Sequence, residues 1–328
     1  MEPLTDATCG TIGLGGQRIV RRLGYGAMRL TGEGIWGPPD DPDAAKALLR
    51  QVVDAGVNLI DTADAYGPDV NETLIAEALR PYPDDLVIAT KGGLTRQGPD
   101  QWSPDGRPEH LRAACEGSLT RLGVEAIDLY QLHRPDPLVP FAESVGAIAE
   151  LVDAGKVRSV GLSNVSVDQL REAQAIVAIH SVQNRYNLRD RASEDVLRAC
   201  EADGIAFLPY FPLGGFGFAK GTPALIEIGE AHGVAPATVA LAWLLARSPV
   251  MTPIPGTSSP AHLADNLASA RLVLHDAELE RLDAFRPEPS QMLKQKLAKA
   301  LPPEAKDRLR EAAGPLRRLW GRLRSRLG

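Results

Sequence analysis

The stretch "VNLIDTADAYG", residues 57–67, joins a short apolar run to a group of polar side chains. Its first residues are mostly aliphatic, a composition that favours a buried strand. Asp61, Asp64 and Tyr66 then crowd together where that strand should end. An exposed turn would be the ordinary explanation of such a cluster, so the question is whether other strands of the chain end in the same way.

Seven more segments have a strand-like composition, and amphipathic patterns separate most of the eight. With 57–63, the candidates are 21–27, 86–91, 127–133, 157–163, 181–186, 205–211 and 250–256. Apolar residues recur at i, i+3 and i+4 over 43–55, 71–80, 109–122, 141–154, 167–178, 193–203 and 236–247. Eight strands alternating with helices over roughly 250 residues predict an α/β protein with a (β/α)8 TIM barrel. A doubly wound sheet fits less well, because about six strands would suffice for it and no G-x-G-x-x-G follows the first strand.

The two ends of the chain differ from this pattern. In "TCGTIGLGGQRIV", residues 8–20, two short apolar segments flank Gly15-Gly16. Such a glycine pair favours a hairpin, and we expect it to cover the N-terminal mouth of the barrel; a frayed terminus is the alternative. The predicted organisation is a capping segment at 1–23, the barrel at 24–286 and a basic amphipathic extension at 287–328.

Composition restricts the class of protein. The 328-residue chain is 44% hydrophobic, and no run of 18 consecutive apolar residues occurs. The N-terminus lacks the basic and apolar regions of a secretory signal. Cys9, Cys115 and Cys200 are odd in number and far apart, which indicates reduced thiols without a metal site. These features predict a soluble cytoplasmic protein.

The charge is distributed unevenly. Residues 291–328 contain 11 Lys or Arg and 3 Asp or Glu, a net charge of +8, so the rest carries −14 of the total of −6. Leu309, Leu316, Trp320, Leu323 and Leu327 form an apolar stripe at helical spacing in this basic segment. The segment could dock on its own barrel or on a second subunit, or lie on an anionic membrane surface. Charge alone predicts no more than nonspecific attraction to nucleic acid.

Reactive side chains end three successive strands. Asp61 and Tyr66 follow one strand, and Lys91 and His133 end the next two. In a (β/α)8 barrel these positions share one rim. A phenol can donate a proton to a developing alkoxide, an ammonium beside it lowers its pKa, and an imidazole can orient a carbonyl. Since no side chain supplies a hydride, this set predicts a carbonyl-reducing site that uses a nicotinamide cofactor.

The chain resembles the aldo-keto reductases from about residue 8 to residue 285. The motifs that carry the resemblance are "LGYGAMRL", "IDTADAYG", "TKGG", "LYQLHRPDP", "GLSNVS", "VQNRYN", "PLGG" and "IPGTSSPAHLADN". The resemblance implies a (β/α)8 barrel, NAD(P)H and a catalytic tetrad of Asp61, Tyr66, Lys91 and His133. It gives Asp64 no role beyond shaping the loop or capping the next segment of the chain.

The resemblance also implies which residues hold NADPH. Ser163, Asn164 and Gln183 would bind the nicotinamide carboxamide, and Tyr210 would lie against its ring. The remaining implied cofactor residues are Gly26, Met28, Asp61, Pro212, Leu213, Gly214, Gly215, Ile254, Gly256, Thr257, Ser258, His262, Asp265 and Asn266. We expect a helix from Ser259-Pro260 to direct its first amides toward a phosphate. Many relatives have lysine and arginine where Gly256 and His262 stand, so NADH is also possible.

Substrate choice depends on the loops. The sequence is most similar to a bacterial branch that includes pyridoxal reductases, which implies reduction of pyridoxal to pyridoxine. Trp36, Trp102, Phe216 and Phe218 lie in predicted Gly/Pro-rich rim loops, either as an apolar wall for an aromatic aldehyde or as anchors of those loops. The alternative function is a nucleotide-sensing subunit that acts through the basic tail.

Overall fold

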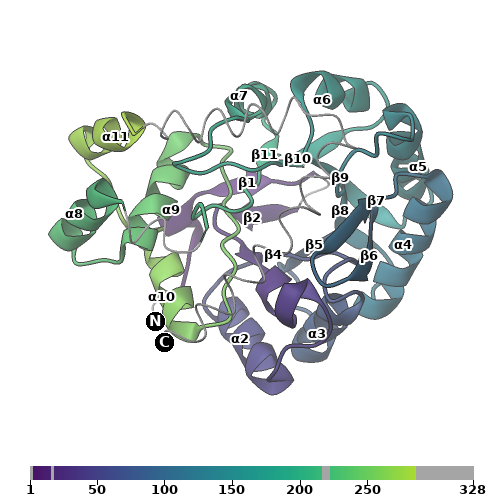
Figure 1. Ribbon diagram of the computed structural model, residues 1–328, viewed down its shortest axis with the longest axis horizontal. Coiled ribbons are helices and arrows are strands. Elements are labelled where there is room, and N and C mark those ends of the chain that lie inside the picture. Colours follow the sequence, from purple (N-terminus) through teal and green to yellow (C-terminus); the bar gives the residue numbers. More distant parts are fainter. Residues whose placement is uncertain (1–2, 16–17, 216–221, 286–328) are drawn as a thin grey trace, which may run out of the picture. The chain divides into compact units, whose positions relative to one another are not determined.

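Seven parallel strands form the central sheet of the computed structural model, which describes residues 3–15, 18–215 and 222–285. Their order is β11 (Ala206–Phe207), β10 (Ile179–Gln183), β9 (Val157–Ser163), β8 (Ile127–Leu132), β5 (Val87–Gly92), β4 (Leu59–Asp61) and β3 (Tyr25–Gly26). The strands curl around one axis, with the helices outside (Figure 1). The predicted (β/α)8 fold is confirmed.

The eighth predicted strand closes the barrel without a regular ladder. The amide of Phe207 donates to the Val250 carbonyl at 2.9 Å, which joins the segment to β11. On the other side, the amide of Gly24 donates to the Pro253 carbonyl at 3.0 Å, beside β3. Pro253 and Pro255 have no N–H to donate, so residues 250–256 lie at the strand position but make only part of the bonding pattern.

Seven helices match the predicted amphipathic ranges to within a few residues. They are α2 (Pro42–Asp54), α3 (Val70–Leu79), α4 (Pro108–Leu122), α5 (Phe141–Asp153), α6 (Val167–Gln174), α7 (Glu194–Asp203) and α9 (Pro236–Arg247). In α2 the Asp41 side chain accepts from the Ala44 amide and Pro42 opens the first turn. Leu48, Leu49 and Val52 bury its inner face. Caps and a single apolar face are therefore enough to specify such a helix.

The N-terminal hairpin covers the mouth at the strands' N-terminal ends. Strand β1 (Thr11–Gly13) pairs antiparallel with β2 (Ile19–Arg21), and both lie across the centre of the ring (Figure 1). Leu14 and Val20 are fully buried against interior residues of the barrel such as Leu59 and Leu129. The predicted hairpin is therefore present, and its buried side chains fill the barrel interior from the N-terminal ends of the strands.

Several elements lie outside the predicted pattern. These are α1 (Asp6–Cys9), the 3₁₀ turns η1 (Ala27–Arg29) and η2 (Glu33–Ile35), β6 (Leu94–Gly98), β7 (Gln101–Pro104), α8 (Pro223–His232) and α11 (Asp276–Asp283). Strands β6 and β7 form a hairpin beside the C-terminal end of β5. The expectation that Trp102 lies in a loop was therefore wrong, since it stands on β7.

The three cysteines are free, as predicted, and all three are buried. Within the described ranges no single helix is long and apolar enough to cross a membrane; α8 and α9 meet that criterion only as a pair bent by 96°. The predicted tail at 287–328, with its apolar stripe, lies outside the described residues, as do Phe216 and Phe218.

Candidate active site

Lys91 lies at the centre of the predicted tetrad, at the C-terminal end of β5. Its Nζ donates to Asp61 Oδ2 at 2.7 Å and to the Thr62 carbonyl at 2.8 Å. The Tyr66 hydroxyl lies 3.4 Å from the same Nζ. Lys91 is fully buried and Asp61 and Tyr66 nearly so. A buried ammonium therefore links the carboxylate to the phenol.

Burial has a larger effect on Tyr66 than the ammonium does. Desolvation raises the pKa of Tyr66, and Lys91 offsets only part of that increase. Lys91 thus lowers the pKa of Tyr66 as expected, but burial raises it by more, and the charge of Asp61 raises it further. For Lys91, burial opposes the charged form, but Asp61 and Tyr66 together leave its pKa raised. The phenol is therefore protonated at neutral pH and can act as a proton donor.

His133 completes the group from the end of β8. Its ring lies 5.8 Å from the Tyr66 ring, centroid to centroid, in an edge-to-face arrangement at 80°. Burial first, then the charges of Lys91, Arg134 and Arg96, lower the pKa of His133 well below its usual 6.5. Its Nδ1 is buried with no hydrogen-bond partner in the described part of the chain. The imidazole is thus neutral, and an N–H on it can donate to a carbonyl oxygen.

Two glutamines orient the other oxygen of Asp61. Gln131 and Gln183 direct their Nε2 groups at Asp61 Oδ1, at 3.1 and 2.7 Å. A carboxylate only accepts hydrogen bonds, so both amides must turn their nitrogens toward it. Gln131 was not among the predicted site residues, although it stands two residues before His133 and so shares its face of β8.

The remaining amide atoms suit a carboxamide. Because Gln183 turns Nε2 to Asp61, its Oε1 stays available to accept from a ligand amide, and no described residue donates to it. Asn164 is engaged instead: its Nδ2 donates to the His133 carbonyl and Ser163 Oγ, and its Oδ1 accepts from the Tyr210 hydroxyl at 2.8 Å. Asn164 has φ of 62°, a conformation that asparagine tolerates.

The loop after β11 has the backbone expected beside a diphosphate. Gly214 and Gly215 have φ of 69° and 101°, which other residues adopt only with strain. Pro212 is buried, and Leu213 is half-buried beside the glycines. The segment lies just beyond Tyr210, whose hydroxyl connects it to Asn164.

The segment that the sequence assigned to the adenosine end of the cofactor lies around α10 (Pro260–Ala268). Ser259 caps this helix and accepts from the His262 amide at 3.5 Å, while Thr257 Oγ1 accepts from the Ser259 amide. Pro260 has no N–H, so the helix start offers fewer free amides than expected. Ser258 and His262 are exposed, Asp265 is half-buried, and Thr257 and Asn266 are buried.

Close main-chain packing joins the two ends of the barrel sheet beside this site. A Cβ on Gly26 would lie 2.8 Å from the Ile254 carbonyl oxygen, and one on Gly256 would lie 2.6 Å from the Gly26 carbonyl oxygen. Only glycine permits this approach. Met28 is half-buried in η1, one turn further on. Of the residues that the sequence assigned to the cofactor, Gly26, Ile254 and Gly256 therefore pack against one another, and Tyr210 is bonded to Asn164.

Two of the predicted substrate residues stand at the rim. The Trp102 ring lies 6.3 Å from both the Tyr66 and the His133 rings, edge-on to each. Trp36 is 37% exposed and bridges to Gly67 through its main chain. Phe216 lies outside the described residues.

Asp64 is buried beside the tetrad. Its Oδ1 has no hydrogen-bond partner within the described residues, and burial together with Glu72 raises its pKa well above the usual value. Its main chain accepts from the Asp69 amide, just before α3. The described bond that shapes this loop is therefore made by the main chain of Asp64, and the loop or capping role expected for its side chain stays a prediction.

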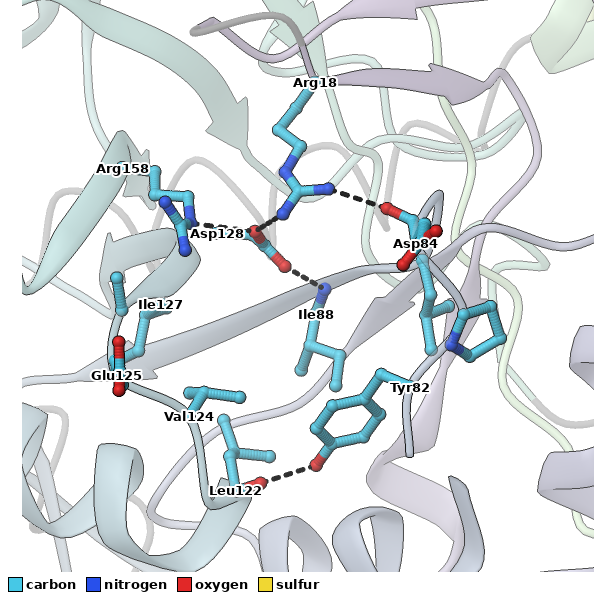
Figure 2. A pocket seen from close by; sticks show the side chains of 13 residues that line it. Arg18, Tyr82, Asp84, Ile88, Leu122, Val124, Glu125, Ile127, Asp128 and Arg158 are labelled. Atoms are coloured by element: carbon cyan, nitrogen blue, oxygen red, sulfur yellow. Dashed lines mark hydrogen bonds and ion pairs between the residues drawn. The ribbon is translucent and has the colours of Figure 1, made fainter. Parts of the chain in front are cut away.

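A cavity of about 330 Å³ lies at the opposite end of the barrel (Figure 2). Asp128, at the start of β8, binds Arg18 at 2.8 Å and Arg158 at 3.4 Å beside it. Tyr82 closes another side, with its hydroxyl donating to the Leu122 carbonyl. Because the tetrad stands at the other end of the strands, this cavity is separate from the predicted chemistry.

Comparison with known proteins identifies the family. The model of the Aldo/keto reductase family matches residues 22–287. An uncharacterized oxidoreductase of Schizosaccharomyces pombe is 47% identical over 268 residues, covering 82% of this chain and 87% of that protein. Pyridoxine 4-dehydrogenase of Escherichia coli is 44% identical over 276 residues, covering 82% and 96%. An aldo-keto reductase from Klebsiella pneumoniae, solved with NADPH, superposes with a TM-score of 0.72 at 28% identity, covering 85% and 95%. The chain belongs to the aldo/keto reductase family.

Proposed function

We propose that this protein reduces an aldehyde or ketone to an alcohol with NADPH, and that Tyr66 donates the proton. The observation that carries the proposal is the position of Lys91 Nζ, which lies 2.7 Å from Asp61 and 3.4 Å from the Tyr66 hydroxyl. When bound, the nicotinamide cofactor supplies the hydride, because no side chain can. The coenzyme in the Klebsiella pneumoniae structure favours NADPH over NADH.

In this proposal each tetrad residue has one task. His133, neutral because burial lowers its pKa, donates a hydrogen bond that orients the carbonyl oxygen. Tyr66, protonated because burial raises its pKa, gives its proton to that oxygen as negative charge develops. Lys91 stabilises the phenolate that remains, and Asp61 holds Lys91 in place.

Most of the proposed cofactor residues lie on the segments that run from Ser163 to α10 along the chain. Gln183 Oε1 and the Ser163 hydroxyl would bind the carboxamide, and Tyr210 would flank the ring. The backbone of Gly214 and Gly215 would lie close to the diphosphate, and Ser258 and His262 would contact the 2′-phosphate. The chain's fit to NADPH rests on these donors and on the close glycine packing at Gly26 and Gly256.

Pyridoxal is the proposed substrate. Support comes from the 44% identity to a pyridoxine 4-dehydrogenase across nearly its whole length. Trp102, beside Tyr66 and His133, offers an aromatic surface to a planar aldehyde. The named relatives are oxidoreductases, so they lend no support to the nucleotide-sensing alternative. The proposal also divides the chain into a capping segment at 1–23, a barrel at 24–286 and a basic extension at 287–328. It includes a cytoplasmic location, and docking of the basic extension on another surface.

A panel of aldehydes tests the function. Purified protein should oxidise NADPH, measured as the loss of absorbance at 340 nm, faster with pyridoxal or 4-nitrobenzaldehyde than without an aldehyde. NADH should be the poorer coenzyme. Tight NADPH binding without turnover of any aldehyde in a broad panel would reject the proposed enzyme. Turnover of 4-nitrobenzaldehyde without turnover of pyridoxal would reject only the named substrate.

A further inference from the structure

Arg96, on β6, lies against the aromatic surface of the proposed site. Its guanidinium carbon is 3.7 Å from the centroid of the Trp102 ring and 5.7 Å from that of Trp36. The short distance to Trp102 places the planar cation on one face of the indole. Trp102 in turn presents its edge to Tyr66 and His133. Neither the sequence motifs nor the proposed mechanism assigns a role to this arginine.

The same guanidinium joins three segments through main-chain carbonyls. Nε donates to the Gln101 carbonyl at 3.0 Å, within the β6–β7 hairpin. One terminal nitrogen donates to the carbonyls of Ile35 and Ala65, at 2.8 and 3.0 Å. The other donates to those of Gly34 and Gly98, at 2.8 and 3.2 Å. The turn η2, the loop that carries Tyr66 and the hairpin that carries Trp102 are thus held by one side chain.

This arrangement needs arginine in particular. The five bonds use the whole fork of a planar group, while its face stays free to stack on the indole. A lysine at this position would keep the charge but has three donors around a tetrahedral nitrogen, and so cannot meet five carbonyls and stack at once. The charge also acts on the site, since Arg96 is one of the cations that lower the pKa of His133.

We propose that Arg96 is a positioning residue that fixes Trp102 beside Tyr66 and His133, and thereby makes the site select planar aromatic aldehydes over aliphatic ones. The proposal rests on the proposed function. Because Ala65 directly precedes Tyr66, the bond to its carbonyl ties the position of the aromatic surface to that of the proton donor.

A double-mutant cycle tests the role with pyridoxal and butanal as substrates. Arg96→Lys should raise KM for pyridoxal by about 3- to 10-fold, the range expected for one aromatic contact, and change KM for butanal by less than about 2-fold. Trp102→Leu should have the same effect, and Arg96→Lys should add nothing in the Trp102→Leu background. Arg112→Lys, an exposed arginine bound to Glu150, is the control and should behave as wild type. Additive effects, or equal losses with both aldehydes, would overturn the proposal.

A second readout does not depend on turnover. Subtracting the tryptophan fluorescence of Trp102→Leu from that of the parent isolates the Trp102 signal. Arg96→Lys should make that signal at least about 2-fold more sensitive to acrylamide, because the ring loses the cation that covers one face. Unchanged quenching would overturn the positioning role. If wild type turns over no aldehyde, the proposed function fails, while quenching still decides whether Arg96 holds Trp102.

Discussion

Gln183 donates a hydrogen bond to Asp61 across the barrel interior, with 2.7 Å between Nε2 and Oδ1. The second carboxylate oxygen of Asp61 receives the Lys91 ammonium, also at 2.7 Å. One carboxylate therefore fixes both the cation behind the proposed proton donor and the amide proposed to bind the nicotinamide. The proposed chemistry and the proposed cofactor position therefore share a single buried group.

Removing this carboxylate should cost stability as well as activity. Asp61→Asn leaves the Lys91 ammonium buried without a counter-charge, and breaking a buried pair in this way costs about 3–5 kcal/mol. Because burial of Lys91 is outweighed by Asp61 and Tyr66, its pKa stays above its usual 10.5 and the ammonium is charged at pH 7. Urea unfolding at pH 7 measures the loss.

The control for this prediction removes both charges. Asp61→Asn combined with Lys91→Met should recover most of the lost stability, since no unpaired charge remains, while activity stays absent. Equal stability of Asp61→Asn and wild type at pH 7 would contradict the ion pair.

The lowered pKa of His133 predicts that the stability of the fold depends on pH. Its pKa is lowered well below 6.5 in the folded protein, so between that lowered value and 6.5 the unfolded chain binds a proton that the folded chain does not. Stability should therefore fall as the pH drops below 6.5. His133→Asn should reduce the difference in the free energy of unfolding between pH 7.5 and pH 5.5.

A His133→Asn variant with the full wild-type dependence would show that the imidazole is not kept neutral by the fold.

The N-terminal hairpin offers a matched pair of glycines. Gly15 has φ of 83°, and a Cβ there would lie 2.3 Å from the His180 ring. A Cβ on Gly13, in the same hairpin, would have no atom within 4 Å of it. Gly15→Ala should lower the free energy of unfolding by about 1–3 kcal/mol, and Gly13→Ala should stay within about 0.5 kcal/mol of wild type.

Catalytic activity per folded molecule should be unchanged in both glycine variants, because the hairpin covers the mouth opposite to the tetrad. Thermal or urea unfolding with kinetics at 25 °C checks both expectations. Similar destabilisation by the two substitutions would contradict the described packing of the hairpin.

Replacing His262 with arginine should increase the affinity for NADPH. A bidentate guanidinium binds a phosphate dianion more strongly than an imidazole does. His262→Arg should lower the Kd for NADPH by about 10-fold and leave the Kd for NADH unchanged. Quenching of protein fluorescence by each coenzyme measures both constants. An equal gain for NADH would place the 2′-phosphate elsewhere.

The barrel and the position of the tetrad were predictable because parallel strands bring their C-terminal residues to one rim. Asp61, Lys91 and His133 end strands that lie side by side, and that ordering follows from the fold alone. The position of the eighth strand was predictable, but its hydrogen-bonding pattern was not. Pro253 and Pro255 lie at the strand position but have no N–H to donate to a neighbouring strand.

Other features depend on long-range packing that composition does not reveal. Lys91 was expected to lower the pKa of Tyr66, but the outcome depends on how deeply both are buried and on Asp61 balancing the charge. Arg96 was missed because its acceptors are main-chain carbonyls of three separate segments. Its neighbour Trp102 was assigned to a loop, although "LTRQGPDQWSP" places a Pro-Asp turn between two short runs, which is a signal for a hairpin.

The central claim is that Tyr66 gives the proton in carbonyl reduction, and single-turnover reduction of pyridoxal tests it most directly. NADPH deuterated at C4 of the nicotinamide is mixed with excess protein, and deuterium in pyridoxine is followed by mass spectrometry. Wild type should place one deuterium on the new alcohol carbon, and Tyr66→Phe should bind NADPH as wild type does but react about 10²- to 10⁴-fold more slowly. A Tyr66→Phe variant that transfers deuterium at the wild-type rate would contradict the account.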